Sequence, residues 1–277
     1  VGWRISEEEF FTKGIALNNL KLRASWGRLG NENALGYYDF LALISTYNTK
    51  YQGYVKGNGD NAWAGSIARG LENRSLKWET TDTKNIGLDF GFFNNKLTGA
   101  MNYYYNQTEE LLITKALPPS AGLNNPILNV GKIRNSGVEV EINWADSKGG
   151  FDYNIGMNFS TTKNKVVELA DKGQVLYGEG LKYGTEHFPT QTRVGKPIGA
   201  FYLYKTNGLF QSNEEARQYV NADGDEYQPF ADAGDIRYVD VNGDGYIDDD
   251  DKVYCGSGIP TLEVNLNFSA GYKGFDL

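Results

Sequence analysis

Apolar and polar positions alternate with a period of two in six segments of the chain. These segments are residues 20–28, 85–93, 96–105, 137–144, 151–160 and 262–272. In the second segment, for example, Ile86, Leu88 and Phe90 alternate with small or polar residues. Successive side chains of a β-strand point to opposite sides, so this alternation predicts strands with one apolar and one polar face. None of these segments has helical spacing, and we therefore expect an all-β fold.

The apolar faces span roughly 9–11 residues, the length at which a tilted strand crosses a bilayer. Aromatic side chains lie at the ends of these faces: Trp26, Tyr105, Trp144, Phe151 and Tyr272. Aromatic rings favour the interface between hydrocarbon and water and form girdles at both ends of membrane-spanning strands. A soluble antiparallel sheet with one face on a core and one in water shows the same alternation. The alternation alone leaves both interpretations open.

The connections between the segments differ in length. Asn94 and Asn95 join one pair, a link of about six residues joins another, and Lys273 and Gly274 form a turn after the last segment. The other links are long, at about 29–83, 106–136 and 161–260. If successive strands are antiparallel, every tight turn falls at one end of the sheet and every long link at the other. Outer-membrane barrels have short periplasmic turns and long extracellular loops, so this asymmetry favours an antiparallel transmembrane β-barrel.

In a barrel the two faces have different surroundings. We assign the apolar face to lipid, as at Ile86, Leu88, Val140 and Ile142, and the polar face to a wet interior, as at Asp89, Glu139, Glu141 and Asn143. Arginine on the lipid face near the bilayer midplane costs ~2–4 kcal/mol, whereas substitutions inside a barrel are mild. The assignment therefore predicts a large penalty for Leu88→Arg and a small one for Asp89→Lys.

Local structure is predicted within the last long link. Ser212 followed by Glu215 is typical of the first turn of a short helix, and Phe201 to Tyr204 has the pattern of a strand. We interpret residues 1–277 as one partial barrel, in which residues 207–260 form an acidic extracellular loop.

Composition narrows the function classes. The chain of 277 residues has 27 Lys and Arg against 35 Asp and Glu, a net charge of −8, which argues against nucleic acid as a partner. The single Cys255 excludes an internal disulfide, and the single His187 makes a catalytic triad or a His-rich metal site a poor interpretation. No phosphate-binding loop, nucleophile elbow or zinc-protease motif occurs, so we expect no enzyme.

The acidity is concentrated in one segment. Residues 221–251 contain eleven acids and one base. Within it, residues 240–251 place oxygen donors at positions 1, 3, 5, 7, 9 and 12 of a twelve-residue loop, with Gly245 at position 6. The donors are Asp240, Asn242, Asp244, the carbonyl of Tyr246, Asp248 and Asp251. This spacing is that of an EF-hand calcium loop, in which alternate oxygen donors converge on a hard cation.

The loop departs from the EF-hand pattern in two ways, which indicate whether it is a structural site or a sensor. Position 12 is Asp251 instead of the usual Glu, as in loops that resemble those of dockerins. The flanking segments have β-like rather than helical patterns. We therefore expect a structural Ca²⁺, or Mg²⁺ given the shorter Asp251, rather than a sensor. An unmetallated turn rich in Asp and Gly is the alternative.

The first long link is the best candidate for substrate binding. Tyr51, Tyr54 and Trp63 lie there among Gly and Asn residues. Aromatic rings can pack on sugar rings while Asn and Asp side chains bond the hydroxyl groups. The alternative is that these rings only pack the loop against its neighbours.

Several longer motifs resemble those of one family. Residues 76–89, 129–141, 195–201 and 234–245 resemble signatures of the SusC/RagA family of TonB-linked outer-membrane proteins. The resemblance extends from about residue 20 to the end of the chain and keeps the order of the family's motifs.

The resemblance implies a 22-stranded barrel closed by an N-terminal plug, a SusD-like surface lipoprotein as partner, and import of oligosaccharides or peptides across the bacterial outer membrane, driven by TonB through the plug. Six predicted strands cannot close a barrel of that size. We therefore expect the chain to be a partial barrel from the C-terminal part of a longer protein, with the plug outside it.

Two other functions remain open at this point. A soluble, secreted β-sandwich that binds carbohydrate and carries a calcium loop would have a polar face open to bulk water. A structural surface-layer or adhesin-like module would bind no small ligand.

Overall fold

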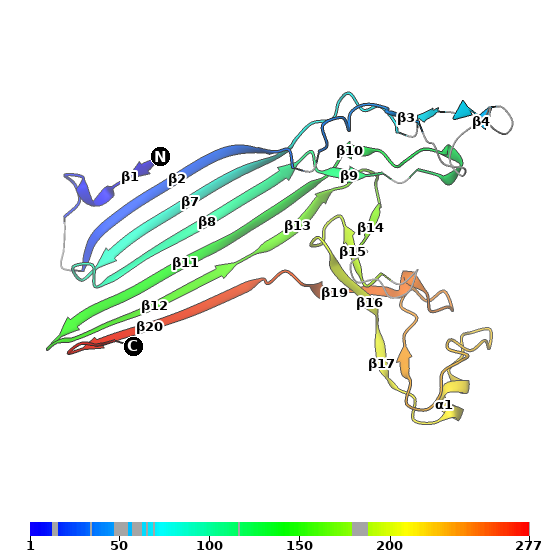
Figure 1. Cartoon of the computed structure of the whole chain (residues 1–277). Coiled ribbons are helices and arrows are strands. Elements are labelled where there is room, and N and C mark those ends of the chain that lie inside the picture. The colour runs from blue at the N-terminus through cyan, green and yellow to red at the C-terminus, as the bar shows by residue number, and fades with distance from the viewer. Residues whose placement is uncertain are drawn as a thin grey trace. The chain divides into compact units, whose positions relative to one another are not determined.

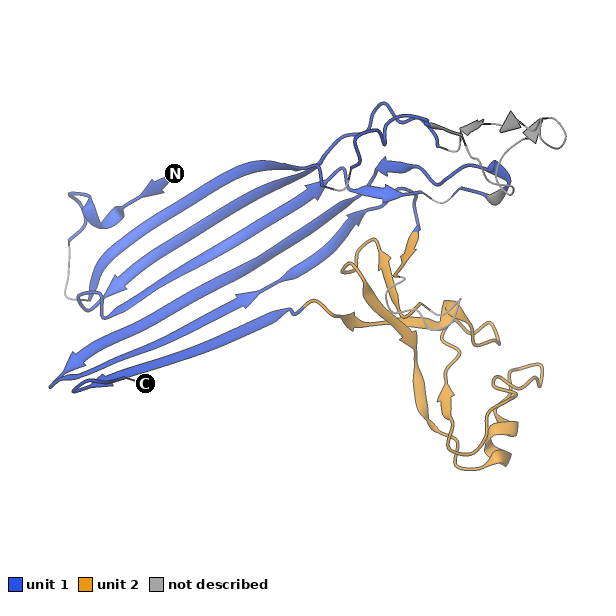
Figure 2. Ribbon diagram, viewed as in Figure 1, with its two compact units in different colours: residues 1–174, 260–277 blue, residues 175–259 orange. Residues whose placement is uncertain are grey.

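The computed structural model describes residues 1–12, 16–33, 35–46, 55–56, 63–64, 66–68, 70–115, 117–178 and 188–276. The chain forms two compact units, residues 1–174 with 260–277 (unit 1) and residues 175–259 (unit 2), shown in Figure 2. The regular secondary structure of both units is mainly antiparallel strand, which confirms the predicted all-β fold. Within the described ranges, no helix is long and apolar enough to cross a membrane.

Unit 1 is built on one long antiparallel sheet (Figure 1). Its six long strands are β2 (Leu17–Asn31), β7 (Glu79–Phe92), β8 (Leu97–Glu109), β11 (Lys132–Lys148), β12 (Phe151–Thr161) and β20 (Leu262–Tyr272), in this order across the sheet. Short strands pair with its two edges: β1 (Gly2–Trp3) with β2, and β21 (Phe275–Asp276) with β20. Strand β13 (Lys163–Glu168) continues beyond β12 and pairs with β11. All six predicted strands are present, and five of them are longer than predicted.

The tight turns all fall at one end of this sheet, as predicted (Figure 1). Asn94 and Asn95 connect β7 to β8 with positive φ angles, which Asn tolerates better than most residues. Gly149 and Gly150 connect β11 to β12, and Lys273 and Gly274 connect β20 to β21, again with positive φ. The long connections leave the sheet from the opposite end.

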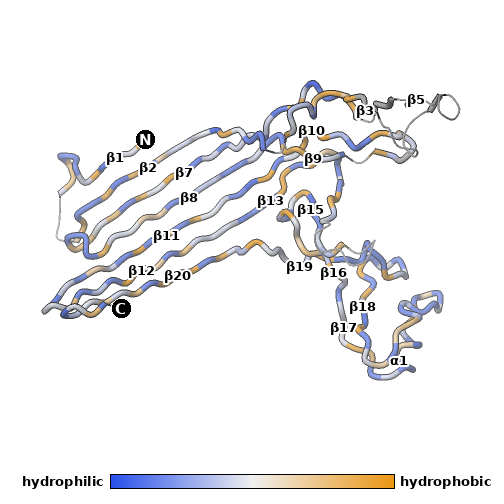
Figure 3. Tube along the Cα trace, in the orientation of Figure 1, coloured by the Kyte–Doolittle hydropathy of each residue, from blue (hydrophilic) through white to orange (hydrophobic). Residues whose placement is uncertain are grey.

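The register aligns side chains of one kind across the whole sheet. One row runs through Leu22, Leu88, Met101, Val140, Phe159 and Val264. The next row, on the other face, runs through Arg23, Gly87, Asn102, Glu139, Ser160 and Glu263. Hydrophobic and hydrophilic colours vary along each strand in Figure 3. With this register, the alternation adds up to one apolar and one polar face of the sheet.

The apolar face of unit 1 is not packed against a second layer. Ile86 is 61% exposed and Leu266 is 76% exposed, although both lie on this face. Among the described residues of unit 1, only Val166 and Leu169 are buried apolar side chains. A soluble β-sandwich needs two facing layers with a common core, so unit 1 does not have the architecture of that alternative.

Short elements occupy the long connections of unit 1. They are β3 (Ile44–Thr46) paired with β6 (Ser66–Ala68), β4 (Val55–Lys56) paired with β5 (Trp63–Ala64), β9 (Leu112–Thr114) paired with β10 (Ile127–Asn129), and η3 (Pro119–Ala121); a further short element, η1 (Ile5–Glu7), lies between β1 and β2. None of them was predicted, because two- and three-residue strands leave no readable alternation.

The described part of unit 2 contains two small sheets and one α-helix. One sheet has the order β14 (Val175–Tyr177), β15 (Thr190–Arg193), β16 (Ala200–Tyr204) and β19 (Lys252–Ser257); the other pairs β17 (Thr206–Leu209) with β18 (Ile236–Tyr238). The remaining elements are α1 (Asn213–Gln218) and η5 (Asp249–Asp251). The predicted strand 201–204 is thus confirmed as β16, and the predicted helix as α1.

The core of unit 2 lies around the helix. Phe210, Ala216 and Ala231 are buried together, and Tyr219 packs against them. Ser212 caps α1, because its hydroxyl accepts a hydrogen bond from the backbone N–H of Glu215 at 3.2 Å. The Glu215 carboxylate in turn accepts the backbone N–H of Gln211 at 2.7 Å. This small core fixes the start of the acidic segment.

Candidate functional site: the polar face and the acidic loop

The polar face of unit 1 combines amide and carboxylate side chains at its centre. A pocket of about 210 Å³ lies on β8, β11, β12 and β20, and its polar lining is Asn102, Glu139, Glu141, Asn158, Ser160 and Asn265. The register places these residues on neighbouring strands of the same face. In the part of the chain that the structure describes, neither glutamate has an ion-pair partner. The face can therefore hydrogen-bond hydroxyl or amide groups.

An ion-pair cluster interrupts this face at β2 and β7. The Arg23 guanidinium donates from Nη2 to Asp89 Oδ1 at 2.6 Å and from Nε to Asp89 Oδ2 at 2.9 Å. Arg23 Nη2 also donates to Asn102 Oδ1 at 2.8 Å, and Lys21 Nζ lies 4.0 Å from Asp89 Oδ2. Asp89 thus lies on the polar face, as predicted, but it is paired rather than simply solvated. Alternation within a strand does not predict this pair, because its partners are 66 residues apart.

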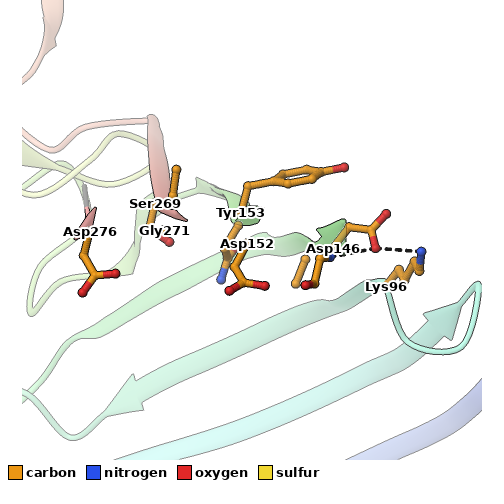
Figure 4. Close-up of a pocket in the computed structure, with 11 residues that line it drawn as sticks. Lys96, Asp146, Asp152, Tyr153, Ser269, Gly271 and Asp276 are labelled. Carbon is orange, nitrogen blue, oxygen red and sulfur yellow. Dashed lines mark hydrogen bonds and ion pairs between the residues drawn. The ribbon is translucent and has the colours of Figure 1, made fainter. Parts of the chain in front are cut away.

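A groove of about 760 Å³ lies at the tight-turn end of unit 1 (Figure 4). Its charged lining is Lys96, Asp146, Asp152 and Asp276. Lys96 Nζ and Asp146 Oδ1 form an ion pair at 2.7 Å, drawn as a dashed line in Figure 4. No ion pair is found for Asp152 or Asp276 among the described residues. The groove is therefore acidic on balance and suits a cationic or hydrogen-bond-donating group.

The acidic loop of unit 2 is held by hydrogen bonds from its own backbone to its carboxylates. Asp240 accepts the backbone N–H of Gly243 at 2.6 Å and that of Gly245 at 2.9 Å. Burial acts to raise the pKa of the Asp240 carboxyl, but the hydrogen bonds from Gly245, Gly243 and the Tyr227 hydroxyl outweigh it and lower that pKa. Gly245 has a φ of +93°, which confirms the sharp turn expected at position 6.

Asp251 closes the loop from the other end. Its side chain is fully buried, and it accepts backbone N–H bonds from Val241 at 2.7 Å, Asn242 at 3.3 Å and Asp248 at 2.8 Å. These bonds link position 12 of the loop to positions 2, 3 and 9. Asp251 is also the C-terminal residue of η5, so the loop ends in a short 3₁₀ turn and then enters β19. The β-like flanks predicted from the sequence are confirmed.

A tyrosine lies beside the same loop. The Tyr204 hydroxyl donates to Asp249 Oδ1 at 3.1 Å. Burial, and next the hydrogen bond to the Asp249 carboxylate, raise the pKa of Tyr204 to about 12. Tyr204 therefore stays neutral and keeps donating throughout the physiological pH range.

The loop supplies the oxygen donors that calcium prefers, and its chemistry fits that ion. Across the described part of the chain, however, no three carboxylate, imidazole or thiol groups are gathered as one metal ion would gather them. The side-chain oxygens of Asp240 and Asp251 instead accept backbone N–H bonds. A cation in this loop would draw on the same carboxylates that now order it.

Most of the other candidate residues lie beyond the part of the chain that the structure describes. Tyr51, Tyr54 and His187 lie outside the described residues, as does the side chain of Trp63. Cys255 is exposed, and its Sγ contacts the carbonyl of Val253 at 3.3 Å. The substrate-binding prediction for the first long link therefore remains a prediction.

Residues 1–276 match the protein family described as TonB dependent receptor-like, beta-barrel. The chain belongs to this family of TonB-dependent receptors. Receptors of this family reside in the outer membrane, and membership explains an open sheet whose apolar face has no protein cover. Their family role is transport rather than catalysis.

Named receptors support the same membership, and a solved structure has the same fold. The chain is 32% identical over 277 residues to TonB-dependent receptor P26 of Formosa agariphila, covering 99% of this chain and 26% of that receptor. It is 29% identical over 282 residues to TonB-dependent receptor SusC of Bacteroides thetaiotaomicron, covering 100% of this chain and 26% of SusC. The RagAB peptide transporter has the same fold, with a TM-score of 0.72 at 21% identity, covering 99% of this chain and 27% of the RagAB chain. The chain thus spans about a quarter of the length of these receptors.

Proposed function

We propose that the chain is part of a barrel that imports oligosaccharides or peptides through the outer membrane, together with a SusD-like surface lipoprotein. TonB would supply the energy through an N-terminal plug elsewhere in the same protein. The observation that carries this proposal is the two-faced sheet of unit 1. Its exposed apolar face suits lipid, and its polar face offers hydrogen-bonding groups to a hydrophilic solute.

The two substrate classes are supported by different features. The chain has the fold of RagAB, whose structure is that of a peptide transporter. The amide side chains around Glu139 and Glu141 suit hydroxyl groups as well as peptide groups. Both substrate classes are hydrophilic oligomers, and the polar face suits both.

Uptake by the full-length protein tests the proposal. Cells that produce the receptor and its lipoprotein should accumulate a labelled oligosaccharide or peptide, and deletion of the plug's TonB-contacting segment should abolish accumulation. Tyr54→Ala and Trp63→Ala should weaken affinity for a glycan if the first long link binds sugars. Uptake that persists without TonB would contradict the proposed energy source, and unchanged glycan affinity in both variants would refute the sugar site.

The acidic loop has a separate proposed role as a structural Ca²⁺ site within the extracellular part of the protein. Asp240, Asn242, Asp244, Tyr246, Asp248 and Asp251 would hold the ion, and Mg²⁺ is the competing ion. The donor types, the turn at Gly245 and the inward position of Asp251 support it. Calcium would replace backbone N–H groups as the partner of the carboxylates and so stiffen the loop.

Calorimetry with the full-length protein tests this role. Calcium should release heat with the wild type and much less with Asp240→Ala/Asp244→Ala. A matched control, Asp223→Ala/Asp225→Ala, removes the same charge from the same segment and should titrate like the wild type. Equal heats for all three proteins would remove the calcium site.

A further inference from the structure

Four cations lie on the same face as the apolar side chains, beyond the end of the apolar rows. They are Lys84 on β7, Arg134 on β11, and Lys163 and Lys165 on β13; we call them the basic belt. The register aligns Lys84 with Tyr105, Ser136 and Lys163 in one row. The next row aligns Asp82 with Gln107, Arg134 and Lys165. Both rows lie toward the end of the sheet from which the long connections leave.

Within the described residues, the structure shows no ion pair for any of the four members of the basic belt. Neighbouring cations on this face differ, because Arg28 is paired with Asp82 at 2.6 Å and Lys132 with Glu109 at 3.0 Å. Lys84, Lys163 and Lys165 are exposed. The basic belt therefore carries positive charge that no ion pair among the described residues neutralises. The neighbouring charged residues, in contrast, are paired with one another.

Aromatic rings lie within the basic belt and in the neighbouring row on its apolar side. Lys84 Nζ lies 5.8 Å and the Arg134 guanidinium carbon 5.1 Å from the centre of the Tyr105 ring. Trp26 pairs with Lys84 and is 69% exposed. Tyr103, one row closer to the apolar centre, is 49% exposed. Exposed aromatic rings of this kind favour the interface between hydrocarbon and headgroups, so the belt lies at headgroup level.

The hydrogen bonding of Arg134 also indicates that this side chain lacks a partner. Its Nη2 donates to Gln107 Oε1 at 3.3 Å, but its Nε is buried and has no hydrogen-bond partner. A buried unpaired guanidinium N–H is costly, because the group has lost water without gaining an acceptor. An oxygen-rich anion seated at the belt would supply that acceptor through a small side-chain movement. A guanidinium and two or three ammonium groups are the typical partners of phosphate.

We propose that the basic belt binds the phosphate groups of a glycolipid of the outer leaflet. This inference rests on the proposed function, because it requires that the apolar face meets lipid and that the long connections are extracellular. Three strand spacings separate Lys84 from Lys163, a width of about 14 Å. The belt is thus wide enough for a headgroup rather than for a single small ion. A lipid phosphate held there would anchor the barrel laterally and complete the coordination of Arg134.

The test compares lipids that differ only in phosphate. Full-length protein in detergent is titrated with fluorescent diphosphoryl lipid A, with the dephosphorylated form of the same lipid, and with inorganic phosphate as competitor. The variant K163Q/K165Q removes two exposed members of the belt and leaves Arg134 in place. Lys77 and Lys172 are exposed lysines in connecting segments of unit 1, so K77Q/K172Q is the control with the same loss of charge.

We expect K163Q/K165Q to bind diphosphoryl lipid A about tenfold more weakly than the wild type, since each cation near an anionic surface contributes several-fold. The control variant should bind like the wild type. The dephosphorylated lipid should bind all three proteins equally and weakly, and inorganic phosphate should not displace the lipid at equal concentration.

Equal binding of diphosphoryl lipid A to the wild type and K163Q/K165Q would overturn the lipid site, as would equal binding of the two lipid forms. Displacement by equimolar inorganic phosphate would assign the belt to free anions instead. The heat-dependent mobility of the protein on gels reports the folded barrel independently of phosphate. Failure of the lipid test with that mobility and substrate uptake intact would leave the proposed transport function untouched.

Discussion

Replacement of Leu88 by arginine tests the assignment of the two faces most directly. Leu88 lies on the apolar face of β7, between Leu22 and Met101 in the register. It is four residues from Lys84 at the basic belt and four from Phe92 near the tight turn. At about 3.3 Å per residue, each end of the apolar stretch is about 13 Å away along the strand. Leu88 is therefore close to the bilayer midplane.

At this depth Leu88→Arg should cost ~2–4 kcal/mol of folding free energy, because a guanidinium in hydrocarbon cannot be solvated without distorting the bilayer. The matched variant is Glu141→Arg, which introduces the same side chain on the polar face, where Glu141 pairs with Ala100 and Asn158. A wet interior solvates the new cation, so its cost should stay below about 1 kcal/mol.

Folding of the full-length variants into phospholipid vesicles at increasing urea concentration measures both costs, with gel mobility reporting the folded barrel. Leu88→Arg should lower the midpoint clearly, and Glu141→Arg should leave it near that of the wild type. Equal shifts for the two variants, or a larger shift for Glu141→Arg, would refute the assignment of the apolar face to lipid.

Three further substitutions probe individual contacts. Asp89→Lys should destabilise the barrel by about 1–2 kcal/mol in the same urea titration, because it removes the partner of Arg23 and adds a third cation beside it. A shift no larger than that of Glu141→Arg would contradict the importance of this ion pair. Gly137→Ala should lower the free energy of unfolding by about 1–3 kcal/mol, since a Cβ there would lie 1.8 Å from the carbonyl oxygen of Thr161. An unchanged urea midpoint would mean that the strands separate easily at this position. Asp251→Ala should make residues 207–260 cleavable at a far lower dose of protease than in the control Asp250→Ala, which changes an exposed residue. The reason is that three backbone N–H groups lose their acceptor. Equal cleavage of the two variants would show that the Asp251 carboxylate does not hold the loop.

The faces of the sheet were predictable because alternation is a local property. Each strand shows which side chains share a face, and antiparallel pairing carries the pattern across the sheet. The six strands, the position of the tight turns and the residues that share the apolar and the polar face all follow from this rule. The cap at Ser212 was predictable for the same reason, since its partner lies three residues away.

Contacts between distant segments were not predictable in this way. The expectation that Asp89→Lys would be mild did not take account of Arg23. The register pairs Asp89 with Lys21 and Arg23 with Gly87, and the Arg23 side chain reaches diagonally to Asp89. The basic belt was missed for a related reason: Lys84, Arg134 and Lys165 lie far apart in sequence, and each has the appearance of an ordinary strand-end charge. In the acidic loop, the spacing identified the donors, but it gave no information on how far backbone N–H groups already satisfy them.

The two units carry different charge, and this bears on how the protein would meet a phosphate-bearing membrane surface. Unit 1 has 20 acids and 20 bases, whereas unit 2 has 15 acids and 7 bases and thus holds the whole net charge of −8. Anionic headgroups repel a unit with the charge of unit 2 within a Debye length of the membrane surface. The same headgroups attract the basic belt of unit 1, although unit 1 as a whole is neutral. The distribution of charge along the chain therefore separates the part suited to contact lipid phosphate from the part suited to stay in water, and neutralisation of the acidic loop by calcium would weaken this separation.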